Sequence, residues 1–114
     1  MTKAAPAEAA IVMTTAGSEA DAESLASAMV ESRLAACVQV MPIRSFYVWR
    51  GKPQRDAEWL LLIKTRGEHY VALETFIRAH HGYETPEIVM VPVSAGSPDY
   101  LAWLTARTEL AARA

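Results

Sequence analysis

The sequence lacks the features that would place the protein in a membrane or an oxidising compartment. It contains one cysteine, Cys37, so no intrachain disulfide can form, and a cytoplasmic protein is expected. The apolar run Ile11 to Met13 near the N-terminus is too short for a secretory signal, and no run approaches the roughly 20 apolar residues of a membrane span. A net charge of -2, with scattered basic residues, gives no basis for a nucleic-acid partner.

The motifs of common catalytic sites are missing as well. The chain has no asparagine, which an acylphosphatase-like domain needs to position water. It also has no glycine-rich phosphate cradle, no H-E-x-x-H motif and no nucleophile elbow. A dyad of Cys37 with a histidine stays open, although no histidine is placed to favour it. The sequence therefore predicts that the protein is not an enzyme.

What the sequence does contain fits one packed domain. Its 114 residues, 52% hydrophobic and 21% charged, predict a single domain over residues 1–114 with an ordered core at about 8–112. Apolar periodicity, caps and Gly/Pro turns predict four strands at 9–14, 36–49, 58–65 and 88–93, and helices from Ser18 to near Leu34, from Gly67 to Gly82, and from Ser97 onward. This βαββαβ order with an extra C-terminal helix is the α+β, ferredoxin-like arrangement.

The prolines agree with that order. In a ferredoxin-like sheet the first and third strands are central, and the second and fourth are edges. Proline cannot donate to a strand ladder and is confined to edges and bulges. Pro42 and Pro92 fall in the expected second and fourth strands, and the expected first and third strands contain none.

The second predicted strand is unusually long. It spans about 14 residues, or roughly 46 Å, where about 5–6 residues is usual. Phe46 and Val48 alternate with Tyr47 and Trp49, so both of its faces are apolar. A compact domain of this size cannot cover both faces of such an arm. Another chain is therefore expected to cover it.

Residues 80–89, HHGYETPEIV, support two interpretations. One is a structural joint: Gly82 ends a helix in a left-handed conformation, and Pro86 holds Thr85 extended before a strand. The other is a metal site. Adjacent histidines on a regular helix point about 100° apart, so metal binding needs a break at Gly82 that brings both rings, or one ring and Glu84, together. Neutral imidazole suits copper and zinc.

Five segments, in this order, resemble the CutA family of divalent-cation tolerance proteins over about residues 9–106. They are RLAACV at 33–38, YVWRGK at 47–52, IKT at 63–65, HGYETPE at 81–87 and DYLAWL at 99–104. The resemblance implies a ferredoxin-like fold, a homotrimer similar in build to PII signalling proteins, and binding of copper or other divalent ions. The only partner it implies is the chain itself.

The resemblance also implies roles for particular residues. In such trimers the long hairpin packs on neighbouring subunits, which makes the interface candidates Phe46, Tyr47, Val48, Trp49 and Trp59. Matching positions line a cleft between subunits, and the cleft candidates are Glu58, Lys64, Tyr83 and Trp49. Lys64 beside carboxylates is also explained as a structural ion pair. A PII-like scaffold that binds a small ligand or partner in these clefts is the alternative function.

The candidate metal ligands are His80, His81, Cys37 and Glu84. Some bacterial members of the family carry a ligand cysteine at the end of the first strand, where this sequence has Thr14. With mainly nitrogen and oxygen ligands, the site is expected to prefer Cu(II). Each ligand has a second interpretation, and for Glu84 it is an ordinary surface residue. The histidines suit a helix C-terminus, and Cys37 suits a buried, inert strand position.

Overall fold

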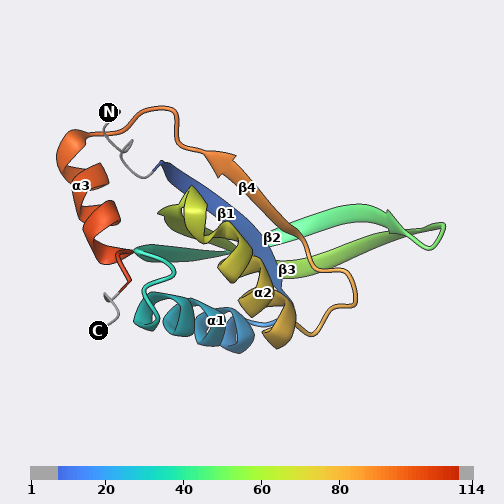
Figure 1. The fold of residues 1–114 in the computed structure, drawn as a ribbon. Coiled ribbons are helices and arrows are strands. Elements are labelled where there is room, and N and C mark those ends of the chain that lie inside the picture. Colours follow the sequence, from blue (N-terminus) through green and yellow to red (C-terminus); the bar gives the residue numbers. More distant parts are fainter. Residues whose placement is uncertain (1–7, 111–114) are drawn as a thin grey trace.

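The structure is a computed structural model that describes residues 8–110. It is a four-stranded antiparallel sheet in the order β2-β3-β1-β4, with α1 and α2 on one face (Figure 1). The elements are β1 (Ala9–Ala16), α1 (Glu19–Glu31), β2 (Cys37–Trp49), β3 (Lys52–Arg66), the 3-10 turn η1 (Gly67–His69), α2 (Tyr70–His80), β4 (Ile88–Pro92) and α3 (Pro98–Arg107). The predicted ferredoxin-like fold is confirmed. The expected core boundary at residue 112 lies outside the described residues.

Local signals in the sequence explain where α1 begins and ends. The Ser18 hydroxyl accepts a hydrogen bond from the Asp21 N–H at 3.1 Å, which confirms the predicted cap. The helix ends at Glu31, three residues before the predicted end. Arg33 takes a left-handed conformation with φ 66°, which reverses the chain and lets Ala35 N–H donate back to Met29 O.

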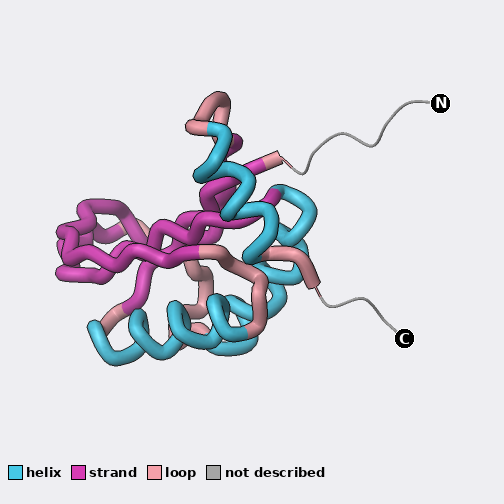
Figure 2. The backbone as a smooth tube through the Cα atoms, turned by 90° about the vertical axis from the view of Figure 1, so that its left-hand side faces the viewer, coloured by secondary structure: helices cyan, strands magenta, loops and turns pink. Residues whose placement is uncertain are grey.

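The core lies between the sheet and the two helices on its covered face. Alternate residues of the central strands point into it, and the apolar stripes of α1 and α2 meet them, so the predicted amphipathic helices are confirmed. The fully buried large side chains include Val12, Leu61, Ile63, Met29, Leu73 and Ile77. In Figure 2, turned by 90°, α1 and α2 again lie on one side of the strands. No helix within residues 8–110 is long and apolar enough to cross a membrane.

The β2–β3 hairpin extends far beyond the rest of the sheet (Figure 1). Its strands pair from Cys37 opposite Lys64 to Trp49 opposite Lys52, around a two-residue turn. Both turn residues, Arg50 and Gly51, have positive φ (52° and 78°), as a type I′ turn requires. Since β1 pairs with β3 only over residues 59–66, residues 43–58 have no third strand beside them. These residues are called the arm below.

The third strand begins earlier than predicted, and this changes the proline argument. It starts at Lys52 rather than Glu58, so β3 contains Pro53. Pro53 lies opposite Val48 in the arm, where β3 has a neighbour on one side only. The edge rule therefore holds for each stretch of a strand, while the prediction that the whole third strand lacks proline is wrong.

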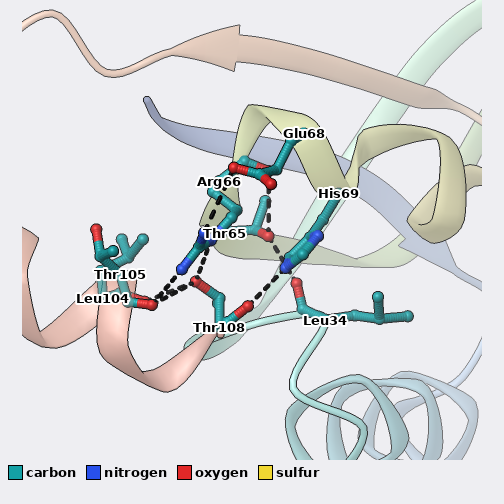
Figure 3. Close-up of polar contacts among 8 residues, drawn as sticks. All are labelled: Leu34, Thr65, Arg66, Glu68, His69, Leu104, Thr105 and Thr108. Atoms are coloured by element: carbon teal, nitrogen blue, oxygen red, sulfur yellow. Dashed lines mark hydrogen bonds and ion pairs between the residues drawn. The ribbon is translucent and has the colours of Figure 1, made fainter. Parts of the chain in front are cut away.

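A buried polar cluster fixes α3 to the rest of the domain (Figure 3). Arg66 Nε donates to Thr108 Oγ1 at 3.0 Å, and a second Arg66 nitrogen donates to Thr105 O. His69 Nε2 donates to Thr108 O at 2.6 Å. Carbonyls at the C-terminal end of a helix lack hydrogen-bond donors within the helix. The side chains of Arg66 and His69 donate to two such carbonyls at the end of α3.

Candidate functional site

The joint between α2 and β4, residues 81–87, begins where His81 leaves the helix. His80 is the last residue of α2, and His81 is already extended, with φ -95° and ψ 142°. Gly82 does not have positive φ, so the predicted left-handed stop at Gly82 is wrong. The chain leaves the helix one residue earlier because the His81 ring is held against the end of β1 through Thr15 O. The strand predicted at 88–93 is confirmed as β4, which ends one residue earlier, at Pro92.

The two histidine rings diverge after this break. His80 Nδ1 donates to Phe76 O at 2.8 Å, and the ring stacks on Phe76 with centroids 4.2 Å apart. Since a carbonyl only accepts, Nδ1 carries a proton. His80 is exposed on the surface of α2. Its second ring nitrogen, Nε2, makes no hydrogen bond to the described residues.

The His81 ring is held at both nitrogens. Nε2 donates to Thr15 O on β1, and Nδ1 accepts the Tyr83 N–H at 3.0 Å. The Tyr83 ring lies against it, with centroids 4.6 Å apart. This ring is the neutral Nε2–H tautomer, and it ties the joint to the end of the sheet.

The other two candidate metal ligands lie apart from the histidines. Glu84 forms an exposed 2.7 Å ion pair with Arg50 at the tip of the arm. Cys37 is half-buried and lies opposite Lys64 on β3. Along β2 it is four residues, or about 13 Å, from Met41, which lies opposite Leu60. Leu60 pairs with Thr15, the residue that holds His81. Within residues 8–110, no group of three His, Cys, Asp or Glu side chains is close enough to hold a metal ion.

Thr14, at the position of the family cysteine, is fully buried on the helix-facing side of β1. Its hydroxyl has no hydrogen-bond partner among the described residues. A threonine there offers no soft ligand, and it faces the core rather than the joint.

A hollow of about 880 Å³ lies between the arm and the joint. Three of the four cleft candidates, Glu58, Tyr83 and Trp49, line it together with Phe46, Tyr47 and Asp56. The fourth, Lys64, lies elsewhere, with its ammonium 5.8 Å from the centre of the Tyr100 ring. Within one chain, three of the four cleft candidates therefore meet in the hollow and Lys64 does not join them.

Two tyrosine–carboxylate pairs dominate the chemistry of the hollow. Tyr83 Oη donates to Glu58 Oε2 at 2.8 Å, and Tyr47 Oη donates to Asp56 Oδ2. Burial of the hydroxyl, with the bond to Glu58 and its charge, raises the pKa of Tyr83 to about 12. The hydrogen bond to Asp56 likewise raises the pKa of Tyr47. Both phenols therefore stay protonated donors at neutral pH.

The interface candidates fall into two groups. Phe46 and Val48 are each 68% exposed, and Tyr47 and Trp49 are exposed beside them on the arm. Trp59, in contrast, is half-buried and packs against the core of its own chain. Four of the five candidates therefore form an uncovered apolar surface.

Two polar partners in the site, Asp56 and Arg50, were missed in the sequence. Asp56 lies opposite Ser45 in the hairpin. On the same face of the hairpin, the neighbouring pair is Tyr47 and Gln54. A two-residue turn at 50–51 sets this register, so placing the turn correctly would have predicted the Tyr47–Asp56 pair. The Arg50–Glu84 pair depends on how the joint folds, and no local pattern indicates it.

Fold and site together define a ferredoxin-like domain with a long, exposed hairpin and an acid-lined hollow at its base. Comparisons with known proteins agree. Residues 10–107 match the family described as CutA1 divalent ion tolerance protein. The chain is 44% identical over 100 residues to the divalent-cation tolerance protein CutA of Pectobacterium atrosepticum, covering 87% of this chain and 91% of that one.

Solved structures show the same likeness. The divalent cation tolerance protein (Cut A1) of Thermus thermophilus is 41% identical, with a TM-score of 0.86 over 89% of this chain and 99% of that one. CutA1 of Oryza sativa is 38% identical, with a TM-score of 0.88 over 91% and 96%. The chain belongs to the CutA1 divalent ion tolerance family.

Proposed function

We propose that the protein is a cytoplasmic homotrimer that binds a divalent metal ion, with Cu(II) preferred, at the joint. One observation carries the metal proposal: the last residue of α2 and the first residue of the joint, both histidines, each donate one ring N–H to a backbone carbonyl. His80 donates to Phe76 O and His81 to Thr15 O. This is the arrangement that orients metal-binding imidazoles and fixes their tautomer. The names of the relatives as divalent-cation tolerance proteins agree with it.

The ligands follow from the two tautomers. The bond from His80 Nδ1 to Phe76 O leaves Nε2 as the nitrogen that a metal would take when the ring is neutral. His81 Nδ1, which accepts the Tyr83 N–H, becomes a ligand when it gives up that bond, while Glu84 is freed when it leaves Arg50. Imidazole nitrogen and carboxylate oxygen suit Cu(II) better than Cu(I). Cys37 lies about 13 Å along the sheet in the same chain, so it joins such a site only from a neighbouring subunit.

The trimer is supported by the uncovered apolar surface of the arm. Phe46, Tyr47, Val48 and Trp49 expose both faces of β2, and Met41, Val89 and Val91 on the rest of the sheet are exposed as well. Apolar surface of this extent marks an interface in a soluble protein. Light scattering is expected to give three times the chain mass of 12.5 kDa, and a folded monomer would refute the proposal.

Calorimetric titration with Cu(II) tests the site. Imidazole must be neutral to bind a metal, so affinity should fall between about pH 7.5 and about pH 5.5, across the usual histidine range. The double variant His80→Ala, His81→Ala should lose binding, and His80→Gln should weaken it while keeping a donor for Phe76 O. Glu23→Gln, on the exposed side of α1, is the control and should bind as the parent does. Equal affinity at both pH values, or in the double variant, would rule the histidines out.

A second candidate function is favoured by the hollow. Its volume of about 880 Å³ lies within the range of small-molecule sites, about 300–1,000 Å³. We propose as the alternative that the trimer is a PII-like scaffold whose hollow binds a small ligand, with metal binding incidental. Titration with small molecules, as described next, separates this function from the metal site.

A further inference from the structure

We propose that the hollow binds a small organic ammonium ion, with Glu58 as its counter-ion. This inference rests on the second candidate function and names its ligand class. Glu58 lines the hollow and is only 7% exposed. Its Oε2 accepts the Tyr83 hydroxyl at 2.8 Å. Oε1 accepts no hydrogen bond among the described residues, and no cation there lies within ion-pair distance of Glu58. A carboxylate this deeply buried is costly without a positive charge beside it.

The described neighbours of Glu58 do not supply that charge. Tyr83, its one donor, is neutral, and its raised pKa keeps it so. Arg50 forms an ion pair with Glu84. The guanidinium of Arg55 lies over the Phe46 ring, 5.6 Å from its centre. Lys64, the predicted partner, lies over Tyr100. Within one chain, the position beside Glu58 Oε1 is therefore open to a bound cation.

The walls of the hollow favour an organic cation over a metal ion. Phe46, Tyr47, Trp49 and Tyr83 line it, and aromatic faces attract ammonium groups while giving a metal ion no ligand. Two of these rings already hold a guanidinium: Arg55 lies over Phe46, and Arg50 lies over Trp49 at 5.5 Å. In contrast, no three metal-binding side chains gather within residues 8–110.

The other acids of the hollow strengthen the preference for a positive charge. Asp56, Glu84 and Glu87 line it with Glu58, against the single lining cation Arg55. Asp56 is engaged by Tyr47 and Glu84 by Arg50, so Glu58 is the deeply buried acid with a free oxygen. The ammonium group is therefore placed at Glu58 Oε1, with the aromatic walls around its carbon atoms.

The test compares choline with its neutral isostere 3,3-dimethylbutan-1-ol on the assembled protein by calorimetry. Choline should bind at least about tenfold more tightly than the alcohol, and putrescine, a primary diamine, should compete with it. Glu58→Gln keeps the shape and an acceptor for Tyr83, and should lower choline affinity about tenfold or more. Glu23→Gln removes one charge away from the hollow and should leave it unchanged.

The outcomes that overturn the inference differ from those that overturn the proposed functions. Equal binding of choline and the alcohol would refute the ammonium class and leave the small-ligand function standing. No binding of choline or putrescine would also refute the ammonium class. Undiminished choline binding by Glu58→Gln would refute the role of Glu58. If that variant does not fold, the comparison of choline with the alcohol on the parent protein still decides the class. A Cu(II) titration of the same sample reports separately on the metal site.

Discussion

Replacing Thr108 by valine should loosen the attachment of α3 by removing one hydroxyl from a fully buried position. Thr108 Oγ1 accepts from Arg66 Nε at 3.0 Å and donates to Leu104 O at 2.8 Å (Figure 3). Valine has nearly the same shape, so the packing is kept while both hydrogen bonds are lost. The experiment therefore isolates the polar contribution of the cluster from the apolar one.

The size of the effect follows from what each partner loses. A hydrogen bond to a charged group contributes about 1.5–3 kcal/mol. The Arg66 side chain is only 11% exposed, so water replaces the lost acceptor poorly. Arg66 still contacts Thr105 O and Glu68, and Leu104 O still accepts the Thr108 N–H at 3.2 Å. These remaining bonds place the loss near the lower end, at about 2 kcal/mol.

Denaturant unfolding followed by circular dichroism measures this loss, at one protein concentration because assembly contributes to stability. Thr108→Ser is the matched control: it keeps the hydroxyl and loses a methyl group, at about 1 kcal/mol. The valine variant should be the less stable of the two. Valine at parental stability, or serine below valine, would show that packing rather than the Arg66 contact holds α3.

Three further predictions concern the arm, the hollow and the thiol. Trp49→Glu should abolish assembly and folding together, because charge on the arm prevents its burial; a folded, stable monomer by light scattering would contradict this. Tyr83 keeps its proton more tightly when folded, so its contribution to stability is present below pH 10.0 and lost as pH rises to about 12. Ultraviolet titration of Tyr83→Phe should lack the tyrosine that ionises near pH 12, and an unchanged curve would refute the assignment. Cys37 should react slowly with thiol reagents in the trimer and faster after dissociation, since it lies half-buried on the sheet face away from the helices; equal rates would count against burial there.

The features predicted correctly from the sequence are those set by short-range chemistry. The helix start at Ser18, the helical periodicity after Gly67 and the start of the last helix after Ser97 depend on residues within a few positions of one another. The strand order followed because few topologies satisfy this alternation of elements. The long arm followed from apolar residues on both faces of one strand.

The features that were missed depend on contacts distant in sequence. His81 is held by Thr15, 66 residues away, and this contact rather than Gly82 decides where α2 ends. Tyr83 reaches Glu58 across 25 residues. The β2–β3 register places Lys64 opposite Cys37, 27 residues away in the sequence. Residue type identified many members of the site, and only the fold decided which of them meet.

Both proposed sites point to assembly as a condition of binding. Within residues 8–110 of one chain, no three metal-binding side chains gather, which is fewer ligands than a Cu(II) site uses. The hollow takes much of its wall from the arm, whose Phe46 and Val48 remain uncovered in one chain. A neighbouring subunit that covers the arm would also restrict water around Glu58 and strengthen its attraction for a cation. Any ligand that binds only the assembled form must in turn stabilise the assembly, because binding and association draw on the same equilibrium. In the proposed trimer, the contacts of the arm that hold the chains together would therefore also complete both proposed sites.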